Sequence, residues 1–206
     1  MADVAITPTS KPFFKQYEFL FFSIGLFIAK SFLLVRLPYR DWNINALYTT
    51  GILAAFYAYF RFRYKLKPPL IIVAFLGAAV AVDVLGNYLH LYGQPFGPVQ
   101  YDEFSHFLTA AFSLPPAMWL LRGTTRRFGL RLPLMLLGFL SATITFSFAA
   151  YYEILELWDE KFYGGKRLWT ATDSANDLQF GLAGIVLATL VMMAVFSLIE
   201  WVEEKA

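Results

Sequence analysis

The sequence contains no cysteine among its 206 residues. Without a thiol the chain can form no disulfide, use no thiolate nucleophile and offer no cysteine ligand to a metal. Charged residues are also scarce, at 16% of the sequence, whereas soluble domains carry roughly 25%. The net charge is only +2 and the Lys and Arg residues fall mainly between apolar segments. Nothing in this charge balance indicates a nucleic-acid partner.

Apolar residues dominate instead, with 58% hydrophobic and 19% aromatic residues. Several windows are long enough to cross a hydrocarbon core of roughly 30 Å at about 1.5 Å per residue. Short connections between them leave no room for a separate soluble domain. The sequence therefore predicts an all-α, polytopic membrane bundle of six transmembrane helices, in contact with membrane lipids. The predicted spans are Tyr17–Val35, Asn45–Phe60, Leu70–Leu89, Glu103–Leu121, Leu132–Leu157 and Asp177–Trp201.

The distribution of basic residues predicts the orientation of this bundle. Eleven Lys and Arg residues lie on the side shared by the N-terminus, loop 61–69, loop 122–131 and the C-terminus, and five lie on the other side. The positive-inside rule then places both termini in the cytoplasm. We expect a cytoplasmic tail over residues 1–16 and a single six-helix domain over residues 17–206. We also expect a multi-pass protein of a bacterial or archaeal cytoplasmic membrane.

Polar residues gather at four helix ends on the predicted non-cytoplasmic side. Each group is a pair spaced by three or four residues, so its members share a helix face. The pairs are Asp83 with Asn87, Asp102 with His106, Glu153 with Glu156, and Asp173 with Asp177. The opposite membrane side shows no comparable pairs, only basic loops. The topology thus predicts one carboxylate-rich cluster close to one membrane face.

Two interpretations of these pairs stay open. Acids near the first turn of a helix suit its dipole, which accounts for Asp102, Glu103, Asp173 and Asp177 without any ligand. The dipole disfavours Asp83 and Glu153, however, because both lie near C-terminal helix ends. So many carboxylates at one depth would also need protons, basic side chains or a cation to offset their repulsion.

If a cation is present, the donor set of carboxylates and one imidazole suits a divalent metal such as Mg, Mn, Fe or Zn. Glu156 is the candidate general base, because it shares a helix face with Glu153. Four further groups would support the ligands or balance their charge, and they are Asp83, Asn87, Lys30 and Arg167. The candidate metal ligands are Asp102, His106, Glu153, Asp173 and Asp177.

Other features of the predicted helices and loops look structural. Pro115–Pro116 is expected to kink its helix. The outer loops "HLYGQPFGPVQ" and "FYGGKRLWTAT" could cap a site. The glycines within the helices should mark close helix packing, and they are Gly25, Gly77, Gly86, Gly138, Gly181 and Gly184.

Three motifs together resemble the YjdF-like inner-membrane proteins. They are a D-x-x-x-H opening in "YDEFSHFLTAAF", a Y-E-x-x-E helix end in "AAYYEILELWDE", and a D-x-x-x-D helix start in "TDSANDLQFGLAG". A weaker resemblance, with Arg167 as an added match, is to the VanZ-like proteins associated with glycopeptide resistance. The segment "WTAT" departs from the family pattern before the last motif. The resemblance implies a membrane fold and a site position, and it implies no reaction.

Two classes of function follow from these predictions. The first is a metal-assisted enzyme that acts near the outer leaflet on a lipid or lipid-linked substrate. The second is a non-enzymatic membrane protein, such as a structural cation site, a small transporter or a subunit of a larger complex. Because the acids lie at a single depth, a transporter with a continuous ion path across the bilayer is less favoured than the other candidates. The oligomeric state is not predicted.

Overall fold

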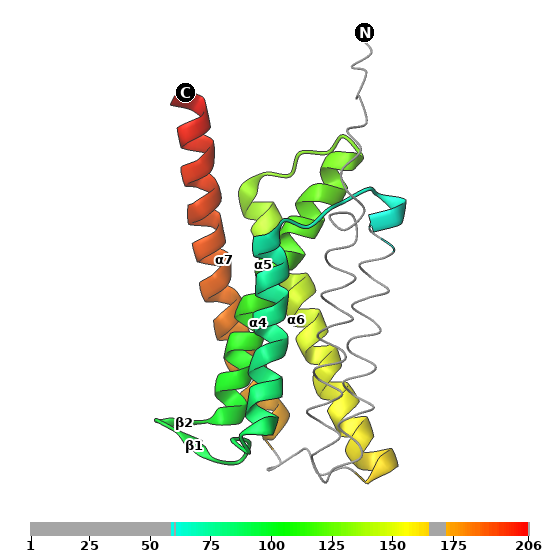
Figure 1. Cartoon of the computed structure of the whole chain (residues 1–206), viewed down its shortest axis with the longest axis vertical. Coiled ribbons are helices and arrows are strands. Elements are labelled where there is room, and N and C mark those ends of the chain that lie inside the picture. Colours follow the sequence, from blue (N-terminus) through cyan, green and yellow to red (C-terminus); the bar gives the residue numbers. More distant parts are fainter. Residues whose placement is uncertain (1–58, 60, 165–171, 206) are drawn as a thin grey trace.

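The computed structural model describes residues 59, 61–164 and 172–205. The predicted tail, the first two predicted spans and the side chains of Lys30 and Arg167 lie outside these residues. The described part is mostly helical, and four long helices form a bundle (Figure 1). These helices are α4 (Leu70–Tyr88), α5 (Tyr101–Arg127), α6 (Leu134–Trp158) and α7 (Asp173–Lys205).

Their ends agree closely with the last four predicted segments, although α5 and α7 are each longer than predicted. Two helices begin directly after a proline, Pro69 before α4 and Pro133 before α6. A π-helical turn, η1 (Asp159–Tyr163), extends α6 and ends at Gly164, whose φ of 72° suits a residue without a Cβ.

Glu103 has a local structural role at the start of α5, because its carboxylate accepts a hydrogen bond of 2.9 Å from the backbone N–H of Gln100. Glu103 therefore helps to cap α5, and its charge also suits the positive end of the helix dipole.

Length and hydropathy qualify three described segments as candidate membrane spans, within Leu70–Asn87, Leu134–Phe162 and Asp173–Ile199. Helix α5 is long enough but is not among them. It packs against α4, α6 and α7, and so lies at the centre of the described helices (Figure 1). A helix surrounded by protein can carry polar side chains that a lipid-facing helix cannot. The helix continues through Pro115 and Pro116, both of which are buried.

A short β-hairpin that the sequence did not predict precedes α5. Its strands, β1 (Pro95–Phe96) and β2 (Val99–Gln100), pair antiparallel around a turn at Gly97, which has a φ of 67°. The Phe96 ring lies 4.7 Å from the Phe104 ring of α5, measured between centroids. The hairpin is thereby held against the first turn of α5, at the end of the bundle where the polar pairs lie (Figure 1).

The interface between α5 and α7 forms the core of the described bundle. Ala110, Leu114 and Ile185 are buried there, with Phe146 of α6 packed against them. Gly184 brings the two helices into backbone contact, because a Cβ at this position would collide with the carbonyl group of Phe107. Gly86 and Gly138 also face side chains closely. The prediction that helix glycines mark close packing is confirmed at these three positions.

Replacing Gly184 with Ala should destabilise the protein by about 1–3 kcal/mol, the usual cost of overpacking a close-packed interior. The obstacle is helix backbone, which cannot move aside as a flexible side chain can. The matched control is Gly181→Ala, one turn away on the same helix, where the nearest atom to the new Cβ would be Ala110 Cβ at 3.9 Å. Thermal unfolding of the purified proteins in detergent tests this. Equal unfolding temperatures for the two variants would contradict the backbone contact.

Candidate metal centre

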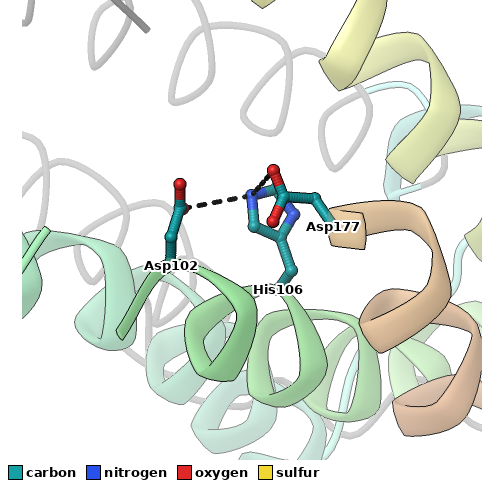
Figure 2. A group of neighbouring side chains, drawn as sticks. All are labelled: Asp102, His106 and Asp177. Atoms are coloured by element: carbon teal, nitrogen blue, oxygen red, sulfur yellow. Dashed lines mark ion pairs between the residues drawn. The ribbon is translucent and has the colours of Figure 1, made fainter. Parts of the chain in front are cut away.

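His106 lies at the centre of a group of carboxylates from three helices. Its Nε2 is 3.5 Å from Asp102 Oδ1 and 3.8 Å from Asp177 Oδ2. Its Nδ1 is 3.5 Å from Glu153 Oε1. Figure 2 shows Asp102 and Asp177 on either side of the imidazole, from α5 and α7 respectively. One imidazole therefore has carboxylates at both of its nitrogens.

The position of the cluster follows from where these residues fall in their helices. Asp102 and His106 lie in the first two turns of α5, Asp177 lies in the second turn of α7, and Glu153 lies five residues before the end of α6. At about 1.5 Å per residue, all four are within roughly 8 Å of a helix end. These ends lie together at the lower end of the bundle in Figure 1. Because α6 runs antiparallel to both α5 and α7, the end of α6 meets the starts of the other two helices, and the residues of the cluster come together.

The cluster is well shielded from solvent. The relative exposure of the side chain is 3% for Asp177, 5% for Glu153 and 17% for His106. Within the described part of the chain, neither carboxylate oxygen of Glu153 makes a hydrogen bond of good geometry, although His106 Nδ1 at 3.5 Å and the Ser174 side chain lie beside it. A buried carboxylate without well-formed hydrogen bonds is costly, since it has lost water and gained little in exchange. The arrangement calls for a proton or a cation close to these oxygens.

Two sets of donor atoms lie close enough together to hold a metal ion. The first set is Asp102, His106 and Asp177, and the second is His106, Glu153 and Glu156. Asp173 lies one turn before Asp177 on α7 and belongs to neither set. Of the six residues predicted as ligands or base, His106 and the four acids around it therefore belong to these sets. Although Asp173 belongs to neither set, its charge still acts on Glu153 and Asp177.

Asp83 and Asn87 form a separate network beside the cluster. Asn87 donates a hydrogen bond of 2.9 Å to Asp83 Oδ1, and the Tyr92 hydroxyl donates another of 3.1 Å to the same oxygen. The Tyr92 hydroxyl also lies 3.5 Å from Ser105 Oγ, and Ser105 donates to the backbone carbonyl of Asp102. The network thus connects the end of α4 to the start of α5 and supports the backbone that carries Asp102.

Tyr92 was missed by the sequence analysis. It lies in the loop between α4 and β1, where one tyrosine among several aromatic residues gives no signal of its own. Burial, and then the nearby charge of Asp83, hold the pKa of the Tyr92 hydroxyl well above its ordinary value. The hydroxyl therefore stays protonated and acts as a donor to Asp83.

Comparison with known proteins gives a family and no function. Searches of curated proteins and of solved structures each found no match. A family model described as "Predicted membrane protein (DUF2238)" matches residues 19–198. This is the family of the YjdF-like proteins, and the weaker resemblance to VanZ-like proteins finds no support in the match. The chain belongs to the DUF2238 family of predicted membrane proteins.

Proposed function

We propose that this membrane protein is a metal-dependent enzyme that acts on a lipid or lipid-linked substrate at the membrane face where the His106 cluster lies. The observation that carries the proposal is His106 itself, which faces carboxylates from α5 and α7 at Nε2 and a buried carboxylate from α6 at Nδ1. Positive-inside topology makes this the non-cytoplasmic face.

The first donor set is the better candidate for the ion. Ligand atoms about 2.1 Å from a metal lie roughly 3.0–3.4 Å from one another. The distances from His106 Nε2 to Asp102 and Asp177, 3.5 Å and 3.8 Å, need only small side-chain movements to reach this range. Two carboxylates and an imidazole nitrogen suit Mg, Mn, Fe or Zn.

Glu153 then has a different role from the predicted one of direct ligand. With the metal at Nε2, the neutral imidazole carries its proton on Nδ1, and Glu153 is placed to accept it. Such a carboxylate fixes both the tautomer and the orientation of a metal-binding histidine. The role also suits a buried acid that makes no hydrogen bond of good geometry among the described residues and has Ser174 as a further neighbouring donor.

Glu156 is the candidate general base. It lies one turn after Glu153, is less buried than Glu153, and belongs to the second donor set around His106. A bound divalent metal would polarise a phosphoryl or carbonyl oxygen and lower the pKa of a water molecule. Glu156 would take the proton from that water. The position of the cluster near helix ends lets the head group of a membrane lipid approach along the membrane face.

A structural cation site is the second candidate. Its support is the low exposure of Asp177 and Glu153, together with the fact that the cluster joins three helix ends. A cation there would offset the repulsion between carboxylates and tie α5 to α7 without any reaction.

One experiment separates the two functions. The full-length protein, purified in mild detergent, is analysed for bound metal and then incubated with a total lipid extract, whose composition is followed by mass spectrometry. We expect about one divalent ion per chain and conversion of a single lipid class that stops when a chelator is added. Metal without conversion of any lipid would favour the structural site, and a protein without stoichiometric metal would refute both.

A further inference from the structure

The end of the bundle opposite the His106 cluster carries a basic surface of different character. Segment 61–69 and the turn after α5 both lie there (Figure 1). Between them, residues 61–69 and 122–133 contain eight Lys and Arg residues and no Asp or Glu. They are Arg61, Arg63, Lys65, Lys67, Arg122, Arg126, Arg127 and Arg131.

Contacts between the two segments make this a single surface. The Tyr64 ring lies 5.7 Å from the Phe128 ring, measured between centroids and in edge-to-face geometry. Leu66 packs close to Gly123 of α5, where a Cβ would lie 3.0 Å from Leu66 Cδ2. The charges of segment 61–69 are thereby held beside those at the end of α5, although almost 60 residues separate them in sequence.

Most of these charges are available to a partner. Arg63, Lys65, Lys67, Arg126, Arg127 and Arg131 are all exposed. No carboxylate in the described part of the chain lies within ion-pair distance of any of them. Arg122 differs, because its guanidinium lies over the Phe196 ring at 4.4 Å from the ring centroid.

Apolar side chains and a hollow accompany the charges. Phe62, Phe128 and Leu130 are 64%, 64% and 58% exposed among the basic residues. Arg126, Gly129, Leu130 and Arg131 line an open hollow of about 450 Å³. A surface that combines cations with exposed aromatic and aliphatic groups matches a ligand with an anionic head and apolar chains.

We propose that this surface binds the head group of an anionic phospholipid, with the phosphate held between Arg126 and Arg131. The charge complementarity favours a lipid over an acidic protein segment, because the apolar residues would meet acyl chains at the edge of the bilayer. Each Arg near an anionic membrane surface contributes about fivefold in affinity, so two of them contribute more than about tenfold. The proposal is independent of the proposed function of the His106 cluster, which lies at the other end of the bundle.

Competition between two lipids tests the proposal. The purified full-length protein is mixed with equal amounts of phosphatidylglycerol and phosphatidylcholine, and the bound lipid is identified by native mass spectrometry. We expect the wild type to bind phosphatidylglycerol with about tenfold preference or more. R126Q/R131Q should lose about tenfold or more of that preference, whereas R126K/R131K should keep most of it.

The matched control is K161Q, which removes an exposed cation at the opposite end of the bundle and should leave the preference unchanged. If R126Q/R131Q does not fold, R63Q/K65Q in the facing segment replaces it, with the same direction expected. Equal binding of the two lipids by the wild type would overturn the proposal. So would an equal loss in K161Q, because the effect would then be one of overall charge.

Discussion

At the proposed metal centre, Asp177→Asn should abolish binding of a divalent ion and, with it, the proposed lipid conversion. The substitution keeps the size of the side chain and removes the negative charge from a residue that is 3% exposed. Asp177 Oδ2 faces His106 Nε2 from α7, so it is the only contribution of that helix to the first donor set. Since loss of an outer partner alone weakens metal binding 10–100-fold, we expect the loss of a ligand to weaken it more than about 100-fold.

Asp173→Asn is the matched control. It makes the same chemical change one turn earlier on α7, at a residue that belongs to neither donor set. Metal content and affinity, measured by elemental analysis and titration calorimetry, should stay within about threefold of the wild type. Equal losses in both variants would show that the general negative charge of the helix start holds the ion. Retention of metal in Asp177→Asn would refute the first donor set as the site.

The sequence predicts the helices well because each one leaves a simple signal. Apolar windows mark the bodies of α4, α6 and α7. Pro133 lies inside the predicted span that begins at Leu132, and the structure starts α6 after this proline. Helix α5 carries the weakest apolar signal, for the physical reason that it packs against three other helices. The hairpin was missed because two-residue strands are too short to show an alternating pattern.

The sequence predicts which helix ends carry the polar residues, but not which of these residues contact one another. Spacings of three and four residues placed Asp102 with His106 and Glu153 with Glu156, and alternation of the helices brought these pairs to one end. Which pairs share the site depends on the axial position of each helix and on loop contacts. Asp173 and Asp177 share a face of α7, but Asp177 lies one turn deeper, at the level of His106. A loop residue, Tyr92, binds Asp83 and keeps it in a network of its own.

Substitution of Glu153 should also change metal affinity strongly. Two substitutions distinguish whether Glu153 orients His106 or binds the metal directly. Glu153→Ala removes the acceptor beside His106 Nδ1 and leaves that N–H unpaired in a buried site. We expect metal affinity to fall 10–100-fold, as is typical for the loss of a carboxylate that orients a metal-binding histidine. Glu153→Gln keeps an oxygen acceptor at the same position, so it should retain affinity within about threefold to fivefold of the wild type, since the imidazole tautomer is preserved.

The Gln variant therefore decides between orientation and direct ligation. A direct ligand loses its charge in Glu153→Gln, so affinity would fall nearly as far as in Glu153→Ala, and the metal would belong to the second donor set. Glu156→Gln provides the comparison within the same helix turn. If Glu156 is the general base, this substitution should slow lipid conversion at least about 100-fold, while metal affinity stays close to the wild-type value. If Glu156→Gln loses metal and Glu153→Gln keeps it, then Glu156 acts as a ligand, and the proton acceptor must be sought elsewhere.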